Sequence, residues 1–274
     1  MRTSGLNKAW QAILLVLIGI VHIIPFYILF NVSFKPTSDT SSYWKPPQIL
    51  YPDNFTNVWV NGNLGRAIVN NSIITISVIA IVLLVGASSA YPLARFKTKL
   101  NNFVYTLFIS TMLVPGMTIL VPLYKIIRDM FGTSTYPSVI IPIVAGELTT
   151  AIFLYTGFIS TIPKELDEAA LIDGCSIFGI FFRILLPLLK PVTATIIILT
   201  GVHAWNDFTY GLFFLQKPSM YNLNVTLNQF MSKYTNETNW VAAGCFTGMI
   251  PMTILYLILQ KYFMKGLTAG AVKG

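Results

Sequence analysis

Six long apolar runs dominate the chain, and polar residues fall mainly between them. The runs cover residues 12–30, 73–93, 104–123, 136–159, 188–208 and 241–263. A helix needs about 20 apolar residues to cross the roughly 30 Å hydrocarbon core of a bilayer. Segments of about ten residues with alternating polarity, which are typical of transmembrane β-barrels, do not describe these runs. The pattern predicts an all-α, polytopic membrane protein with six transmembrane helices.

The composition narrows the class of protein further. Of the 274 residues, 54% are hydrophobic and 10% are charged, whereas about a quarter of the residues in soluble proteins are charged. This balance of hydrophobic and charged residues excludes a disordered chain. The net charge is +8, but the basic residues are scattered and do not form a nucleic-acid-binding arm. Cys175 and Cys245 form no CxxC pattern, and His22 and His203 have no HExxH spacing. We therefore expect no metal site and no catalytic residues.

The distribution of the 18 Lys and Arg residues predicts the orientation in the membrane. With the N-terminus inside, the inner segments hold more of these residues than the outer loops, although the outer loops are longer. The densest cluster, Arg95-Phe-Lys97-Thr-Lys99, directly follows the second run. The first run is too long for the apolar region of a signal peptide, so we interpret it as an uncleaved anchor. Both termini are expected to be cytoplasmic.

One predicted cytoplasmic loop, residues 162–187, is rich in acidic side chains. Pro163 suits the first turn of a helix, and the acidic residues that follow lie near its positive end. Gly174 is a natural residue to end that helix, and a second short helix is predicted from Ser176 to Leu186. The loop is thus expected to form a helix–turn–helix under the bilayer. From the residues alone, it is either a solvated amphipathic surface or a docking element.

The spacing within this loop resembles a known signature. Glu168-Ala169-Ala170, Gly174, Ile184 and Leu186-Pro187 match the fixed positions of the EAA loop of ABC importer permeases. Three other segments are similar to segments of the maltose-type, oligosaccharide-importing group: Ser33-Phe34-Lys35-Pro36, Trp205-Asn206-Asp207-Phe208 and the C-terminal Gly266–Gly274. The chain is therefore identified by resemblance as the second permease subunit of a binding-protein-dependent carbohydrate importer.

The resemblance implies a type I ABC importer permease fold in a bacterial plasma (inner) membrane. It also implies four kinds of partner: a homologous second permease, two ATPase subunits, an extracytoplasmic solute-binding protein and an oligosaccharide. The chain itself contains no GxxxxGK[ST] loop, so ATP and magnesium would bind in the partner ATPase and the chain would not be an enzyme. The expected divisions are an N-terminal segment with the first helix (1–31), an outer loop (32–67), the transmembrane core (68–263) with its EAA loop (162–187), and a cytoplasmic tail (264–274).

The same resemblance assigns the residues that would couple to the ATPase: Glu165, Glu168, Ala169, Ala170, Asp173, Gly174 and Pro187. It also assigns an outer loop that would contact the binding protein, with Lys233, Tyr234, Thr235 and Asn236. The small side chains of Ala169 and Ala170 are expected to allow close approach of the partner.

Four further residues are candidates for the translocation pathway. Glu147 lies near the middle of the fourth run, and an acidic residue at that depth is a functional candidate because its insertion is costly. Its alternative role is a hydrogen bond to a neighbouring helix. Trp205, Asn206 and Asp207 combine an aromatic ring with polar side chains, which suits a sugar, although aromatic residues also occur at ordinary membrane interfaces.

Two other functions compete with oligosaccharide import. An ABC importer for a polyol or for glycerol phosphate would share the EAA loop. An intramembrane enzyme that uses Glu147 or His203 is the third hypothesis, but the sequence lacks the residue spacing of known catalytic motifs.

Overall fold

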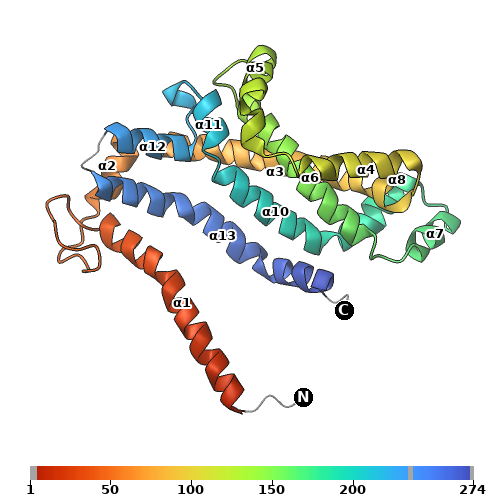
Figure 1. Cartoon of the computed structure of the whole chain (residues 1–274), viewed down its shortest axis with the longest axis horizontal. Coiled ribbons are helices and arrows are strands. Elements are labelled where there is room, and N and C mark those ends of the chain that lie inside the picture. Colours follow the sequence, from red (N-terminus) through yellow and green to blue (C-terminus); the bar gives the residue numbers. More distant parts are fainter. Residues whose placement is uncertain (1–4, 234–236, 272–274) are drawn as a thin grey trace. The chain divides into compact units, whose positions relative to one another are not determined.

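The computed structural model describes residues 5–233 and 237–271, and every regular element within these ranges is helical (Figure 1). The predicted all-α class is confirmed. The helices are α1 (Gly5–Ser33), α2 (Asp53–Asn61), α3 (Leu64–Arg95), α4 (Lys99–Thr111), η1 (Gly116–Ile119), α5 (Leu120–Phe131), α6 (Tyr136–Ile159), α7 (Glu165–Ile172), α8 (Ile177–Gly179), η2 (Ile180–Leu185), α9 (Leu186–Leu188), α10 (Lys190–Trp205), α11 (Thr209–Phe214), η3 (Pro218–Met220), α12 (Leu223–Lys233) and α13 (Thr238–Ala271).

Four helices in the described part of the chain are long and apolar enough to cross a membrane by themselves. They correspond to the first, second, fourth and sixth predicted runs and cover Trp10–Ser33, Leu64–Arg95, Tyr136–Ile159 and Thr238–Tyr262. Two bent helix pairs pass the same test only when each pair is taken together, Lys99–Thr111 with Gly116–Phe131 and Ile177–Leu188 with Lys190–Trp205. The structure therefore has four spans, or up to six if each bent pair counts as one.

The third predicted run is not one continuous helix. Its two halves meet at an angle of 92°, and Pro115 stands at the start of the second half with extended backbone angles. Proline has no N–H to donate and its ring clashes with the carbonyl four residues earlier, so it breaks a helix that is not forced to continue. Pro191 in the fifth run instead lies in the first turn of α10, where proline is well tolerated.

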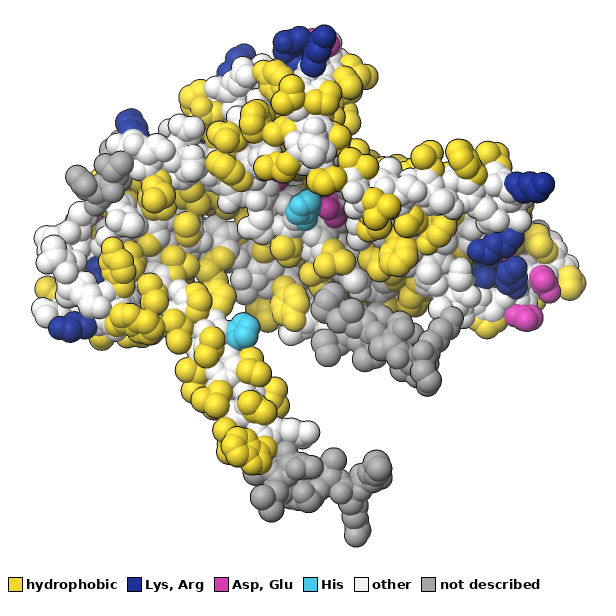
Figure 2. Space-filling view, viewed as in Figure 1, with side chains coloured by type: hydrophobic (Ala, Val, Ile, Leu, Met, Phe, Trp, Pro, Cys, Tyr) yellow, Lys and Arg dark blue, Asp and Glu magenta, His cyan; other side chains and the backbone are white. Residues whose placement is uncertain are grey.

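The chain divides into two compact units. The first unit comprises residues 1–65 and 226–250, and the second comprises residues 66–225 and 251–274. An aromatic cluster of Phe30, Phe34, Phe55 and Phe246 holds the first unit together, with ring centroids 4.7 Å apart for Phe30 and Phe34. The apolar side chains of α1 are otherwise largely exposed, as Figure 2 shows, which suits a helix in contact with lipid or a partner.

Helix α6 is the centre of the second unit. It contacts α4, α5, α10 and α11 (Figure 1). Helix α3 also packs closely against it, because a Cβ added at Gly86 would lie 3.1 Å from the Cβ of Ala151. Tyr155 is 1% exposed, and its hydroxyl shares a hydrogen bond of 3.0 Å with that of Thr193 on α10. Small residues and buried hydroxyls of this kind are the usual means by which transmembrane helices associate.

Candidate functional site: the coupling loop, an intramembrane pair and the outer loops

The loop between α6 and α10 forms the predicted helix–turn–helix. Helix α7 is followed by a reversal at Gly174, which has a φ of +81°. Such a backbone conformation costs little only for glycine. The second helix begins at Ser176, whose hydroxyl accepts a hydrogen bond of 3.2 Å from the N–H of Gly179. Beyond α8 this second helix continues through the π-helical turn η2 into α9.

A buried ion pair fixes α7 to the end of α3. The guanidinium of Arg95 places Nε 2.8 Å from Oδ2 of Asp167, without the geometry of a hydrogen bond. Its Nη2 donates to Oδ1 of Asp167 at 3.2 Å, and its Nη1 donates to the carbonyl of Ile162 at 2.9 Å. The side chains of Arg95 and Asp167 are only 5% and 13% exposed.

Sequence reasoning missed this pair. It assigned Arg95 to the topology signal and left Asp167 among the acidic residues near a helix start. The two residues are 72 positions apart, so no local periodicity connects them. The only available signal is a basic residue at the end of a span and an acidic residue in a loop expected on the same side of the membrane.

The coupling residues assigned from the sequence fall on two faces of the loop. Most are exposed, namely Glu165, Glu168, Ala169, Asp173, Gly174 and Pro187. Ala170 is 7% exposed and belongs to the chain's own hydrophobic core. The small side chain of Ala170 therefore packs within this chain. Of the two alanines, only Ala169 is exposed to a partner. Two apolar side chains that the sequence analysis did not select, Ile172 and Phe178, are 87% and 77% exposed.

Within the second unit, Glu147 on α6 pairs with His203 on α10. Nδ1 of His203 lies 2.5 Å from Oε1 of Glu147. When Glu147 is ionised, its carboxylate only accepts hydrogen bonds and the ring nitrogen is the donor. The side chain of Glu147 is 12% exposed and that of His203 is 73% exposed. The pair gives the costly carboxylate an interhelical partner and leaves the imidazole accessible on the surface of the unit.

The other three candidates for the translocation pathway are buried or form hydrogen bonds with nearby backbone groups. Trp205 is 4% exposed, and the amide of Asn206 donates to the carbonyl of Val202 in its own helix at 2.8 Å. The carboxylate of Asp207 accepts hydrogen bonds from the N–H groups of Tyr210 and Gly211 at 3.1 and 2.8 Å. In this conformation Asp207 therefore caps the start of α11.

Two loops that the sequence predicts to be extracytoplasmic meet in the first unit. Of the predicted contact loop, Tyr234, Thr235 and Asn236 lie outside the described residues, and Lys233 is exposed at the end of α12. Directly after this stretch, Oε2 of Glu237 accepts a hydrogen bond of 2.8 Å from Thr37, and the amide of Asn239 donates to the carbonyl of Lys35 at 2.6 Å. The segment that follows α1 is thus joined to Glu237, directly before α13, and to Asn239 in the first turn of α13.

Comparison with known proteins identifies the class. Residues 82–269, more than half of the chain, match the family described as "Binding-protein-dependent transport system inner membrane component", and the chain belongs to this family. It is a multi-pass membrane permease of the ABC transporter class, and the family predicted from the EAA spacing is confirmed.

Individual relatives agree with this membership. The chain is 44% identical to the melibiose/raffinose/stachyose import permease protein MelC of Bacillus subtilis, over 96% of this chain and 95% of the relative. It is 33% identical to the probable starch degradation products transport system permease protein AmyC of Thermoanaerobacterium thermosulfurigenes, over the full length of both. Its fold is similar to that of a chain in a bacterial ABC transporter that imports alginate, with a TM-score of 0.79, 21% identity and coverage of 96% and 99% of the two chains.

Proposed function

We propose that this chain is one of two permease subunits of an ATP-driven, binding-protein-dependent importer of an oligosaccharide. The observation that carries the proposal is the exposed helix–turn–helix with EAA spacing in a chain of this family. The relatives named above include permeases for raffinose-type sugars and for starch degradation products, which supports an oligosaccharide over a polyol or glycerol phosphate.

The loop around α7 is the element that docks on the ATPase in this proposal. Exposed apolar side chains at Ile172 and Phe178 offer area to bury against a partner, and an exposed apolar surface of this kind on a polar loop typically marks an interaction site. Glu165, Glu168 and Asp173 place negative charge around it. The Arg95–Asp167 pair joins this loop to α3, so that a movement imposed on α7 by closure of the ATPases would reach a transmembrane helix directly.

The translocation pathway is proposed to pass the Glu147–His203 pair. Both groups can exchange hydrogen bonds with sugar hydroxyls, and the exposed imidazole is the more accessible of the two. Trp205, Asn206 and Asp207 lie one turn or less beyond His203. We place them at the outer end of the same passage, with Asp207 acting through the helix it caps.

The outer side of the protein is proposed to receive the binding protein. We place both termini on the cytoplasmic side of the membrane and the segment 32–67 on the extracytoplasmic side. The transmembrane core is then 68–263, and the cytoplasmic tail is 264–274. The loop with Lys233, Tyr234, Thr235 and Asn236 then faces the binding protein. A solved alginate transporter of similar fold, with a TM-score of 0.66, is described in complex with its periplasmic protein.

Uptake of labelled raffinose into ATP-loaded vesicles tests the proposal. Vesicles that hold this chain, a homologous permease, the ATPase and the binding protein should accumulate the sugar, whereas vesicles with this chain alone should not. Accumulation by this chain alone, or by the complete assembly without ATP, would refute the proposed function. Uptake of glycerol phosphate with rejection of raffinose would refute the choice of substrate.

A further inference from the structure

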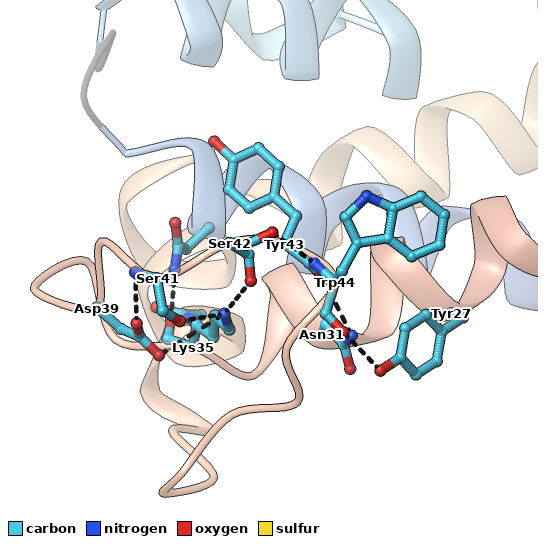
Figure 3. A network of polar contacts seen from close by, with 10 residues as sticks. Tyr27, Asn31, Lys35, Asp39, Ser41, Ser42, Tyr43 and Trp44 are labelled. Carbon is cyan, nitrogen blue, oxygen red and sulfur yellow. Dashed lines mark hydrogen bonds and ion pairs between the residues drawn. The ribbon is translucent and has the colours of Figure 1, made fainter.

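Three consecutive backbone carbonyls in the segment after α1 are each held by a different side chain (Figure 3). The hydroxyl of Tyr27 donates to the carbonyl of Trp44 at 2.8 Å, and the amide of Asn31 donates to that of Tyr43 at 3.1 Å. Nζ of Lys35 donates to the carbonyl of Ser42 at 2.9 Å. Tyr27 and Asn31 are four residues apart in α1, a spacing that places side chains on one face of a helix, and Lys35 follows shortly after the end of α1.

Lys35 is the strongest of these attachments. It is 1% exposed, and a buried ammonium group is costly unless it is fully paired. Besides the carbonyl of Ser42, its Nζ donates to Oγ of Ser41 at 2.8 Å and lies 3.8 Å from a carboxylate oxygen of Asp39. Residues 39–44 are therefore held in one conformation before any ligand arrives, which reduces the entropy lost on binding.

The attachments fix the backbone but leave two aromatic side chains exposed. Tyr43 and Trp44 are 54% and 58% exposed. They border a recess of about 620 Å³ whose other walls carry five Ser and Thr hydroxyls, the carboxylate of Asp39 and the amide of Asn239. Hydrogen bonds from Ser41 and the charge of Lys35 hold the pKa of Asp39 below its usual value, so the carboxylate is ionised. No Lys, Arg or His is among the residues that line the recess.

We infer that this recess is a saccharide-binding site on the outer side of the permease. Small-molecule sites combine apolar and aromatic walls with a few well-placed polar groups. Sugars present apolar C–H faces that pack on aromatic rings, and their hydroxyls both donate and accept hydrogen bonds. The lining carries no cation to pair with a uronate, and the carboxylate of Asp39 is already paired with Lys35, so the recess favours a neutral saccharide.

The position of the recess fits this role. It rests on the proposed function, because only in that orientation does the recess face the side from which sugar arrives. Asn239, one of its lining residues, follows the segment proposed to contact the binding protein. A sugar released by the binding protein would therefore meet a preformed site beside the point of release.

Raffinose binding to the complete importer, reconstituted in nanodiscs without binding protein or nucleotide, tests the inference. Saturation-transfer NMR or calorimetry should detect binding to the wild type, and Trp44→Ala and Tyr43→Leu should each weaken it about tenfold. Trp59→Ala is the matched control, since Trp59 is an exposed ring of the same unit that does not line the recess. Trp44→Phe keeps a ring and should retain most of the affinity. It serves as the second variant at this position if Trp44→Ala fails to assemble.

Three results would overturn the inference: no raffinose binding by the wild type, equal affinity of Trp44→Ala and the control, or weaker capture of the binding protein by Trp44→Ala with raffinose affinity unchanged. The last result would show a protein-docking surface instead. Uptake is measured on the same variants reconstituted in sealed vesicles, with binding protein outside and ATP inside. Recess binding without uptake would refute the proposed function alone, and uptake without recess binding would refute the recess alone.

Discussion

Removing the guanidinium of Arg95 tests whether the coupling loop is positioned by the end of α3. The side chain of Asp167 is only 13% exposed. In Arg95→Met its carboxylate would therefore stay largely buried in the native geometry, without its ionic partner. Breaking a buried pair by removing one partner costs about 3–5 kcal/mol. The carbonyl of Ile162 also loses its donor, worth about 0.5–1.5 kcal/mol. Since Asp167 is near a loop surface, we expect a total of about 3 kcal/mol.

This magnitude is large compared with the intrinsic stability of α7. The helix has eight residues, and isolated helices shorter than about 12–15 residues are marginal in water. A loss of about 3 kcal/mol corresponds to a change of roughly a hundredfold in the population of the anchored loop. Sugar-stimulated ATP hydrolysis by the assembled importer should therefore fall sharply, while basal hydrolysis by the ATPase remains.

A double-mutant cycle separates this effect from general damage. Arg95→Met with Asp167→Leu removes both charges and should recover much of the stimulated hydrolysis, because no carboxylate is left buried and unpaired. Lys97→Met is the control, since Lys97 is an exposed cation two residues away and should behave as the wild type. Stimulated hydrolysis that is unchanged in Arg95→Met, or that is as low in the double variant as in the single one, would refute this reasoning.

Three further predictions follow from the same geometry. Ala169→Trp should reduce co-purification of the ATPase without lowering the melting temperature of the permease pair, whereas Ala170→Trp should lower that temperature, because overpacking a core costs about 1–3 kcal/mol. Glu147→Leu should reduce raffinose uptake about tenfold with assembly intact, and Glu147→Gln should retain more of it because an amide still accepts from His203. Gly174→Ala has open space for the added methyl group, so it should cost only the strain of the positive φ, about 1–2 kcal/mol of loop stability, measured by hydrogen exchange.

The placement of the four unbroken membrane spans was decided by the sequence. Crossing a bilayer requires a continuous apolar stretch, and that requirement is local, so the runs at 12–30, 73–93, 136–159 and 241–263 could be recognised directly. The reversal in the coupling loop is local as well, because Pro163 and Gly174 restrict the backbone wherever they occur. The break in the third run was not anticipated, since whether a helix bends or breaks at Pro115 depends on what packs around it.

The contacts on which the candidate sites depend were decided by the tertiary structure alone. Arg95 meets Asp167 across 72 residues, and Glu147 meets His203 across 56. The sequence placed Glu147 in a span and gave a hydrogen bond to a neighbouring helix as its alternative role, but hydropathy does not say which face of α6 meets which face of α10. Packing chooses that face, because buried charges and carbonyls are stable only where a partner from another segment reaches them.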